Sequence, residues 1–506
     1  MAHTQVLDGE SLMIEEFYRL MYDDTIKIKV SESAWDKVKA SRAIVDQLVQ
    51  TCQVSYGINT GFGSLKDTII PADQLVELQH NLIKSHAVGC GTNIPLSRVR
   101  GMLALRINTL VKGYSGVSVN LIERLVEFFN LGIFSPVPEK GSCGASGDLI
   151  PLSHLVLGYM AFGELYDPTK QTYRDAKSVL NDYKLSPLVL SYKEGLGICN
   201  GTQFITVYAA EAVYLAEQLF NQSQTISALT LEALRGTFKA FDQRISDVRL
   251  HPGQARVSEM LRENLDAANG GSERHQKYGI NNVQDAYSLR AMPQVHGVLY
   301  DTIMMTKKVI TTEMNSATDN PLVFPDGDII SGGNFHGQYP GTYCDYLSIA
   351  LTTYGNISER RIERLVNGSL SKLPSFLIHE NPGVNSGLML CQYNCAALSA
   401  ENRCKANPAS VHSIPTCENQ EDMVSMGAYA SRKTLEILEN VYHIVAIELF
   451  CAFNAYEFLP EKTTDKLEKV VKMVREHVEP VTKDRYMKPD IDKIKQMLFE
   501  NKFVSN

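Results

Sequence analysis

The chain has 506 residues, which is enough for a large hydrophobic core and two or three domains. Its 49 Lys and Arg residues against 57 Asp and Glu residues give a formal net charge of -8, so nothing in the charge favours binding to nucleic acid or to an anionic membrane. No apolar run approaches the length of a membrane-spanning helix, and the start of the chain lacks the pattern of a secretory signal. We therefore expect a soluble cytoplasmic protein.

The ten cysteines are scattered and form no disulfide framework. Cys391 and Cys395 lie four residues apart on a predicted helix, and no nearby histidine completes a zinc site. These cysteines are interpreted as small buried residues of a reducing compartment, and no metal is expected.

The amino-terminal part shows two apolar patterns at helical spacing. The first starts at Ser33, with Asp36 placed as in a capping box, and the second runs from Leu75 to Ile83 and ends near His86. Tyr56 lies between them in the glycine-punctuated loop 56–63. Taken alone, this loop would be a surface turn and His86 a structural residue. Helical spacing continues over 98–129, and 158–193 reads as an irregular connection.

Residues 141–152, Gly-Ser-Cys-Gly-Ala-Ser-Gly-Asp-Leu-Ile-Pro-Leu, allow unusual backbone chemistry. Glycine and other small residues let the backbone bend tightly and be approached closely. If the Gly147 nitrogen is forced onto the Ala145 carbonyl carbon, a five-membered ring closes with loss of water. Loss of the Ser146 hydroxyl as a second water leaves an exocyclic methylene, which is an electrophile. In isolation the same residues would be a turn in which Asp148 caps a helix.

Long stretches with few helix breakers dominate the chain after residue 203, and they predict packed long helices at 204–235, 295–315, 346–366 and 426–459. Two shorter amphipathic helices are predicted in the tail, on either side of Pro480. Polar loops separate the long helices, and loops on a rigid scaffold are where chemistry is commonly found. We expect three contiguous domains, at 1–203, 204–470 and 471–506.

The loops taken together closely resemble the aromatic amino-acid ammonia-lyases. The matching segments are Tyr56 in Tyr-Gly-Ile-Asn-Thr-Gly-Phe-Gly, Ala145-Ser146-Gly147, Asn200 in Asn-Gly-Thr-Gln, residues 284–290, residues 315–321, Phe335 in Gly-Gly-Asn-Phe-His-Gly, and Gln420-Glu421-Asp422. The resemblance implies an all-α architecture of the fumarase/aspartase type, with an amino-terminal portion that bears the electrophile and a bundle of long helices. It also implies the prosthetic group 4-methylidene-imidazol-5-one (MIO), formed from Ala145-Ser146-Gly147, and a homotetramer whose active sites are shared between subunits.

Within that family the chain is most similar to the histidine ammonia-lyases. Phenylalanine and tyrosine lyases have Phe-Leu or His-Leu where this chain has His86-Ala87, and they have a glutamine where this chain has Glu421. Residues 284–290 are also closest to the histidine enzymes. An imidazole ring has two polar nitrogens that need partners when they are buried, and His86 and Glu421 offer a donor and an acceptor.

The resemblance implies a role for each site residue in deaminating L-histidine to trans-urocanate and ammonia, the first step of histidine degradation. Tyr56 is the base that removes the β-proton, and its pKa should be lowered by hydrogen bonds or a positive charge. Arg290 holds the substrate carboxylate. Tyr287 and Glu421 are expected to take part in catalysis, and His86, Asn200, Gln284 and Phe335 to bind substrate. Asp148 and Asn200 are expected to support the MIO ring. Asn200 and Tyr287 are also expected to position the ring and the substrate amine.

Three positions depart from the family pattern, Cys143, His412 and Met423, and we expect them to alter packing and to leave the chemistry intact. The alternatives on the same scaffold are a histidine 2,3-aminomutase and a lyase for tyrosine or phenylalanine. An alternative of another class is a catalytically silent helical scaffold in which the ring never forms. Whether the electrophile bonds the substrate amine or its ring stays open.

Overall fold

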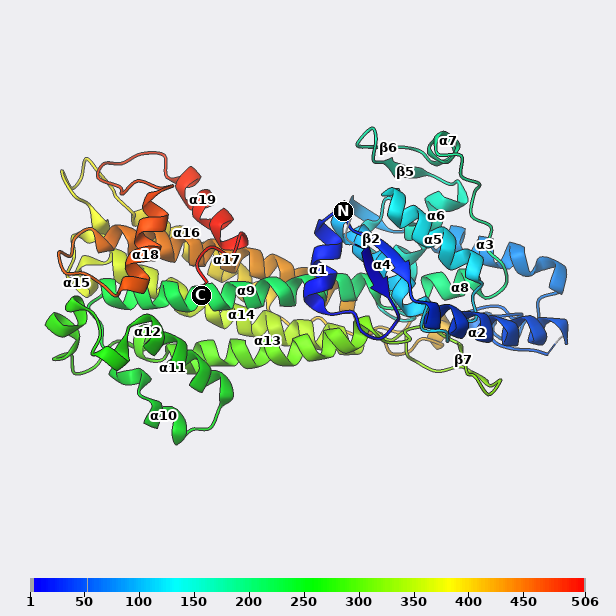
Figure 1. Ribbon diagram of the computed structural model, residues 1–506, viewed down its shortest axis with the longest axis horizontal. Coiled ribbons are helices and arrows are strands. Elements are labelled where there is room, and N and C mark those ends of the chain that lie inside the picture. The colour runs from blue at the N-terminus through cyan, green and yellow to red at the C-terminus, as the bar shows by residue number, and fades with distance from the viewer. Residues whose placement is uncertain (1–3, 52, 505–506) are drawn as a thin grey trace. The chain divides into compact units, whose positions relative to one another are not determined.

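Helices dominate the structure, a computed structural model that describes residues 4–51 and 53–504 (Figure 1). The expected mainly α architecture is confirmed. The four long predicted helices are α9 (Gln203–Ala233), α13 (Met292–Met314), α14 (Gln338–Val366) and α17 (Gly427–Tyr456). Their apolar residues at three-four spacing are buried along their lengths, which is why these stretches form helices that pack.

The remaining helices are shorter. They are α1 (Ile14–Tyr22), α2 (Glu32–Gln50), α3 (Leu75–His86), α4 (Leu96–Leu110), α5 (Val119–Leu131), α6 (Leu149–Leu157), α7 (Ala176–Asp182), α8 (Glu194–Cys199), α10 (Gln243–Asp247), α11 (Pro252–Asn264), α12 (Tyr287–Arg290), α15 (Gly368–Ser371), α16 (Met389–Lys405), α18 (Asp465–Arg475) and α19 (Lys488–Phe499). The tail therefore contains the two predicted helices, α18 and α19, and Pro480 lies between them.

The strands of the described chain form four two-stranded sheets. One is parallel, β1 (Thr4–Leu7) with β2 (Lys27–Val30), and three are antiparallel, β3 (Cys90–Asn93) with β4 (Pro138–Lys140), β5 (Glu164–Asp167) with β6 (Thr172–Asp175), and β7 (Leu322–Val323) with β8 (Ile329–Ile330). The β5–β6 hairpin and α7 give regular structure to part of the region 158–193, which was expected to be irregular.

Two helix boundaries differ from the sequence-based expectation. Helix α2 begins at Glu32, because Ser31 is the residue whose side chain accepts a hydrogen bond, from the Ala34 N–H at 3.3 Å; the predicted cap, Ser33, lies inside the first turn. The helical spacing over 98–129 is divided between α4 and α5. Gly113 and Gly116 have φ values of 82° and 66°, which end the first helix, and Ser118 caps the second.

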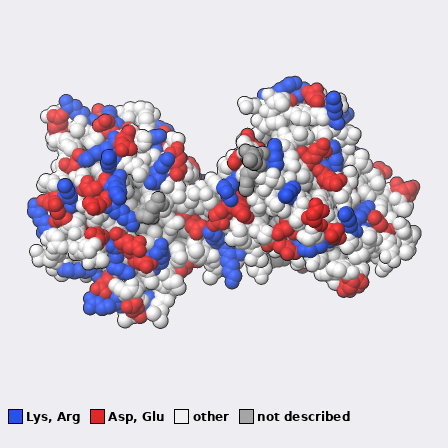
Figure 2. All heavy atoms as spheres, viewed as in Figure 1, with Lys and Arg blue, Asp and Glu red and all other residues white. Residues whose placement is uncertain are grey.

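The chain divides into two compact units, each of which draws on three stretches. Unit 1 comprises Met1–Tyr214, Thr306–Asp345 and Pro408–Arg432, and unit 2 comprises Leu215–Met305, Tyr346–Asn407 and Lys433–Asn506. The contiguous domain ranges 1–203, 204–470 and 471–506 are not tested by this division and stay a prediction. Within the described residues no helix combines the length and apolarity needed to cross a membrane. Acidic and basic side chains are interspersed over the face shown in Figure 2.

The core of unit 2 contains a fully buried ion pair. Arg361 of α14 donates to both carboxylate oxygens of Glu448 on α17, at 2.6 and 2.8 Å, and neither side chain is more than 1% exposed. Ser358 and Thr230 also donate to Glu448, at 2.5 and 2.9 Å. A buried charge pair repays its desolvation only when its hydrogen-bonding capacity is filled in this way. This pair therefore fixes how α14 and α17 pack inside unit 2.

Candidate active site

The loop before α6 bends through two glycines in the left-handed region. Gly144 and Gly147 have φ values of 70° and 74°, which only glycine adopts at little cost. Two backbone carbonyls of the loop accept hydrogen bonds from a distant stretch of unit 1. The Met426 N–H donates to the Cys143 carbonyl at 2.8 Å, and the Ser425 hydroxyl donates to the Gly144 carbonyl at 3.2 Å. The backbone just before the Ala-Ser-Gly segment is therefore held by residues 425 and 426.

Gly147 lies directly against the backbone of Gly201. The two residues form a parallel bridge, and the Asp148 N–H donates to the Gly201 carbonyl at 2.6 Å. A Cβ added to Gly147 would lie 2.2 Å from that carbonyl oxygen and 2.7 Å from its carbon, distances that no real Cβ shows. Gly201, in the Asn-Gly-Thr-Gln segment, thus lies against the peptide that the sequence marks for cyclisation.

Asp148 is fully buried beneath the loop. It does not cap α6 with its side chain; instead its carboxyl accepts the Ser142 hydroxyl at 2.7 Å and the Ile205 N–H at 3.0 Å. Burial raises the pKa of Asp148 to about 7, and these hydrogen bonds offset only part of that effect. The side chain joins the loop to the first turn of α9.

A cavity of about 540 Å³, here called the first cavity, lies next to Ser146. It is lined by five residues that the sequence predicted as site residues or their neighbours: Tyr56, Ser85, His86, Asn200 and Glu421. A second cavity of about 580 Å³ shares Tyr56, Ser146, Asn200 and Glu421 with it and adds Ala145 and Phe335 to its lining. All of these residues belong to unit 1, and the fold brings them together from six separate parts of the sequence.

Glu421 is the direct partner of the serine. The Ser146 hydroxyl donates to Glu421 Oε1 at 2.6 Å, and the Thr416 hydroxyl donates to Oε2 at 2.8 Å. Backbone hydrogen bonds between Thr416 and Glu421, at 2.9 and 3.3 Å, close the short loop that carries both residues. The carboxylate is thereby fixed with one oxygen at Ser146, where the reaction is expected to take place.

Tyr56 reaches the same cavity, but its titration differs from the expectation. The Gly63 N–H donates to the phenol oxygen at 3.3 Å, which favours the ionised form. Burial and the nearby negative charge of Glu421 act in the opposite direction and are stronger, so the pKa of Tyr56 is raised above its ordinary value. The prediction of a lowered pKa is therefore wrong for the residues within one chain, because burial could not be read from the sequence.

His86 ends α3 at the edge of the first cavity. Its Nδ1 lies 3.0 Å from the Ser85 hydroxyl, which leaves Nε2 for another partner. Burial lowers the pKa of His86, although the nearby Glu421 charge opposes this shift. A neutral imidazole at this place can donate or accept one hydrogen bond, depending on its tautomer.

Asn200 carries a buried polar atom without a partner. Its backbone carbonyl accepts a hydrogen bond from Arg106 at 2.8 Å, whereas its side-chain Oδ1 has no hydrogen-bond partner in the described chain. Asn200 is 4% exposed and lines both cavities. Leaving a buried carbonyl oxygen unpaired costs about 1–3 kcal/mol, so this atom marks a place where a donor is expected to bind.

Gln284, Tyr287 and Arg290 lie in unit 2 and line neither cavity. Tyr287 is 73% exposed, and the Arg290 guanidinium lies 4.4 Å from its ring centre. Arg290 Nε is buried without a hydrogen-bond partner. The two cavities are therefore formed without these three residues of the same chain.

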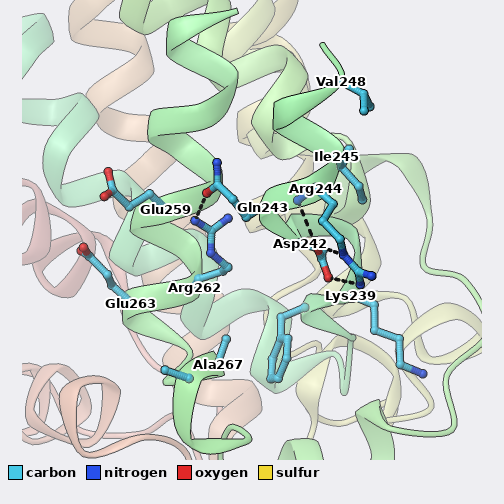
Figure 3. Close-up of a pocket in the computed structure, with 12 residues that line it drawn as sticks. Lys239, Asp242, Gln243, Arg244, Ile245, Val248, Glu259, Arg262, Glu263 and Ala267 are labelled. Atoms are coloured by element: carbon cyan, nitrogen blue, oxygen red, sulfur yellow. Dashed lines mark hydrogen bonds and ion pairs between the residues drawn. The ribbon is translucent and has the colours of Figure 1, made fainter. Parts of the chain in front are cut away.

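Unit 2 has a larger hollow, of about 1130 Å³, that offers less chemistry (Figure 3). Three basic side chains on its wall are bonded to neighbouring groups. Arg244 pairs with Asp242 at 2.7 Å, Arg262 donates to Gln243 at 2.6 Å, and Lys239 donates to the Ile280 carbonyl at 2.6 Å. Size alone therefore does not identify the site.

Several residues of the site were not singled out from the sequence. Thr416 orients Glu421, and Cys417 and Leu196 line the first cavity. Cys417 also accepts a hydrogen bond from the Ser64 N–H at 3.4 Å. Thr416 and Cys417 lie within five residues of Glu421, so their closeness in sequence to Glu421 was the available signal.

Met423, one of the three departures from the family pattern, lines the second cavity, and His412 is exposed. Among residues 4–51 and 53–504 no three His, Cys, Asp or Glu side chains are grouped to hold a metal.

Comparison with known proteins gives consistent matches over nearly the whole chain. The family model for aromatic amino acid lyases matches residues 12–476. The histidine ammonia-lyase of Bos taurus is 49% identical over 499 residues, covering 98% of this chain and 76% of that protein. The crystal structure of histidine ammonia-lyase from Trypanosoma cruzi has a TM-score of 0.91 at 43% identity, covering 99% of this chain and 94% of that one. Tyrosine aminomutase from Streptomyces globisporus has a TM-score of 0.89 at 33% identity, covering 98% and 97%.

Proposed function

Because the chain belongs to the aromatic amino acid lyase family, we propose that it converts L-histidine into trans-urocanate and ammonia, in the cytoplasm and as the first step of histidine degradation. Family membership makes the chain a carbon–nitrogen lyase of the ammonia-lyase type. The observation that carries the choice of substrate is the presence of Glu421 and His86 around the same cavity as Ser146. Both side chains can pair with the nitrogens of an imidazole, which a phenyl ring would leave without partners.

The residues around Ser146 fit a MIO group formed from Ala145-Ser146-Gly147. Gly147 lies against Gly201 so closely that a side chain would not fit, and the Asn200 Oδ1 atom is buried without a partner. Asn200 would hold the ring, and Asp148 would support it from below. When formed, this group supplies the electrophilic methylene that makes loss of the substrate amine possible.

The chain's own side chains then bind the substrate and move one proton. Glu421 accepts a hydrogen bond from the imidazole N–H, and His86 pairs with the substrate ring through Nε2. Tyr56 removes the β-proton at its phenol oxygen. Burial raises the pKa of Tyr56, and none of the groups that shift this pKa within the described chain is a cation, so this step needs a positive charge from elsewhere. Phe335 lines the second cavity and would shape the pocket beside Ser146.

We further propose that the enzyme is a homotetramer in which the active site is completed by other copies of the chain. The support is the exposure of one residue of α12: Tyr287 is 73% exposed, and the Arg290 guanidinium lies 4.4 Å from its ring centre. In this proposal Arg290 of a neighbouring copy binds the substrate carboxylate, and Gln284 and Tyr287 of that copy line the pocket. The same guanidinium would supply the positive charge that Tyr56 needs.

The test compares wild type with Ser146→Ala, and uses Ser178→Ala as a control that removes an exposed hydroxyl elsewhere in unit 1. Each purified protein is incubated with L-histidine, and urocanate is followed by its ultraviolet absorbance while the intact mass is measured. Wild type and Ser178→Ala should form urocanate and be lighter than their sequences by two waters. Ser146→Ala should do neither. Urocanate formation by Ser146→Ala would refute the proposal.

A second candidate is a histidine 2,3-aminomutase, because tyrosine aminomutase from Streptomyces globisporus shares this fold at 33% identity. The same incubation separates the two reactions. An aminomutase would return the amine to the β-carbon and accumulate β-histidine without equivalent release of ammonia. Stoichiometric ammonia and urocanate support the lyase. β-Histidine as the main product would refute the lyase and support the aminomutase.

A further inference from the structure

Glu313, near the end of α13, is a carboxyl group without a role so far. The Thr202 hydroxyl donates to Glu313 Oε1 at 2.5 Å. Burial raises the pKa of Glu313 to about 7, and the bond from Thr202 opposes this only in part. Glu313 also lines a third cavity, of about 530 Å³, together with Lys308, His336 and Gln338. Burying a carboxyl group costs free energy, so we ask what its contact with Thr202 does.

Thr202 connects this carboxyl group to the cyclising segment. It follows Gly201, whose carbonyl accepts the Asp148 N–H at 2.6 Å and whose backbone bridges Gly147. The position of the Gly201 backbone therefore limits where the Gly147 backbone can lie. A displacement of Gly201 by a few tenths of an ångström would relax this contact, because the Asp148 nitrogen and the Gly201 carbonyl oxygen are only 2.6 Å apart.

The end of α13 is itself fixed inside unit 1. The Asn108 side chain of α4 donates to the Met314 carbonyl at 2.9 Å, and Thr109 donates to the Ser316 carbonyl at 3.4 Å. Glu313 is thus anchored to a helix of the core, and its hydrogen bond transmits that anchoring to Thr202. On the other side, Arg106 of α4 donates to the Asn200 carbonyl at 2.8 Å. Gly201 lies between these two points.

We propose that Glu313, acting through Thr202, is a positioning residue for the cyclisation of Ala145-Ser146-Gly147, a step that rests on the function proposed above. In that step the Gly147 nitrogen bonds the Ala145 carbonyl carbon, and the carbonyl oxygen leaves as water with the protons of the Gly147 and Ser146 nitrogens. The Ser146 hydroxyl and the Ser146 Cα proton then leave as a second water, and a Cα–Cβ double bond remains. No oxidant or reductant is needed.

The experiment follows ring formation itself. Full-length protein is made by cell-free synthesis, samples are stopped at intervals and digested, and the fraction of the 145–147 peptide that has lost two waters is measured by mass spectrometry. Removing the hydrogen bond, by Glu313→Leu or Thr202→Val, should slow this loss by about tenfold, the effect of a hydrogen bond worth about 1.4 kcal/mol. Glu313→Gln and Thr202→Ser keep an acceptor and a donor, and both should react at close to the wild-type rate.

Two controls separate positioning from general destabilisation. Glu211→Leu breaks an ion pair elsewhere in unit 1, with Arg98 at 2.7 Å, and should leave the rate of water loss unchanged in the protein that folds. The double variant Thr202→Val/Glu313→Leu should be no slower than either single variant, because both remove the same bond. The folded fraction of each variant is measured by circular dichroism, and rates are compared per folded molecule.

The outcomes distinguish this proposal from the function on which it rests. Equal rates in wild type, Thr202→Val and Glu313→Leu would overturn the role of Glu313 and leave the proposed function intact. The same holds if Glu313→Gln and Thr202→Ser are as slow as the disruptive variants. A wild-type peptide that never loses two waters would overturn both proposals. If Glu313→Leu fails to fold, the comparison of Thr202→Val with Thr202→Ser decides the question.

Discussion

Replacing Glu421 by glutamine would remove one negative charge from the first cavity and leave the shape of the side chain almost unchanged. In the described chain Glu421 Oε1 accepts the Ser146 hydroxyl at 2.6 Å, and Thr416 holds Oε2 at 2.8 Å. Once ring formation has removed the Ser146 hydroxyl, Oε1 is the acceptor that a substrate imidazole N–H would meet. The variant therefore tests the residue that selects histidine.

The expected magnitude follows from the two kinds of acceptor. A hydrogen bond to a charged group contributes about 1.5–3 kcal/mol, and one to a neutral amide about 0.5–1.5 kcal/mol. The difference of about 1–1.5 kcal/mol predicts that kcat/KM for L-histidine falls about five- to tenfold in Glu421→Gln. Glu421→Ala removes the acceptor entirely and should cost about 100-fold, or somewhat less than 3 kcal/mol.

The assay is the initial rate of urocanate formation, divided by the fraction of protein that has lost two waters at residues 145–147. This correction separates substrate binding from any effect of Glu421 on ring formation. Glu418→Gln is the matched control, because it makes the same chemical change on an exposed residue of the same segment. A corrected kcat/KM that is equal in wild type, Glu421→Gln and Glu421→Ala would refute the reasoning.

Three further predictions concern other groups of the structure. Tyr56→Phe should lower kcat by about 100- to 10,000-fold, the range for loss of a general base, and should leave the loss of two waters unchanged. Wild-type kcat/KM should rise with pH through the neutral range because the pKa of Tyr56 is raised. Activity retained in Tyr56→Phe would exclude this base. Because the pKa of Asp148 is raised from 3.8 to about 7, the folded protein binds this proton more tightly than the unfolded chain, and the stabilising effect is lost as the pH rises between these values. Asp148→Asn should therefore gain stability relative to wild type across this window, by up to about 4 kcal/mol, as measured by urea unfolding at several pH values; a constant difference would contradict the raised pKa. Arg361→Met leaves the buried Glu448 without its charged partner and should destabilise unit 2 by about 3–5 kcal/mol, whereas Arg361→Met/Glu448→Leu should recover part of the loss; equal chemical stability of wild type and the single variant would show that the pair contributes nothing.

The long helices could be predicted from the sequence because their apolar spacing repeats over many turns. Their ends could not be predicted as well. Helix α14 begins at Gln338 rather than near Tyr346, and Ser31 rather than Ser33 caps α2, because a cap depends on which side chain reaches the first free N–H groups. The division between α4 and α5 depends on two positive φ angles that the apolar spacing does not reveal.

Part of the candidate site was also predictable. The segments that carry Tyr56, His86, Asn200 and Glu421 are far apart in the sequence, and the fold brings them together around Ser146. The direction of the Tyr56 pKa shift could not be predicted, because it depends on burial and on the distance to Glu421. The contact between Thr202 and Glu313 was equally hidden, since it joins the residue before α9 to the last turn of α13, and no local pattern connects the two.

The loop that carries Ser146 depends on a part of the chain that is synthesised much later. Its carbonyls at Cys143 and Gly144 bind Met426 and Ser425, and its serine binds Glu421. A nascent polypeptide that has emerged from the ribosome only as far as residue 400 contains the Ala-Ser-Gly sequence but none of these three partners. The reactive alkene would therefore be made late, in nearly finished molecules, and shortened translation products would be spared an electrophile that could attack other cell constituents.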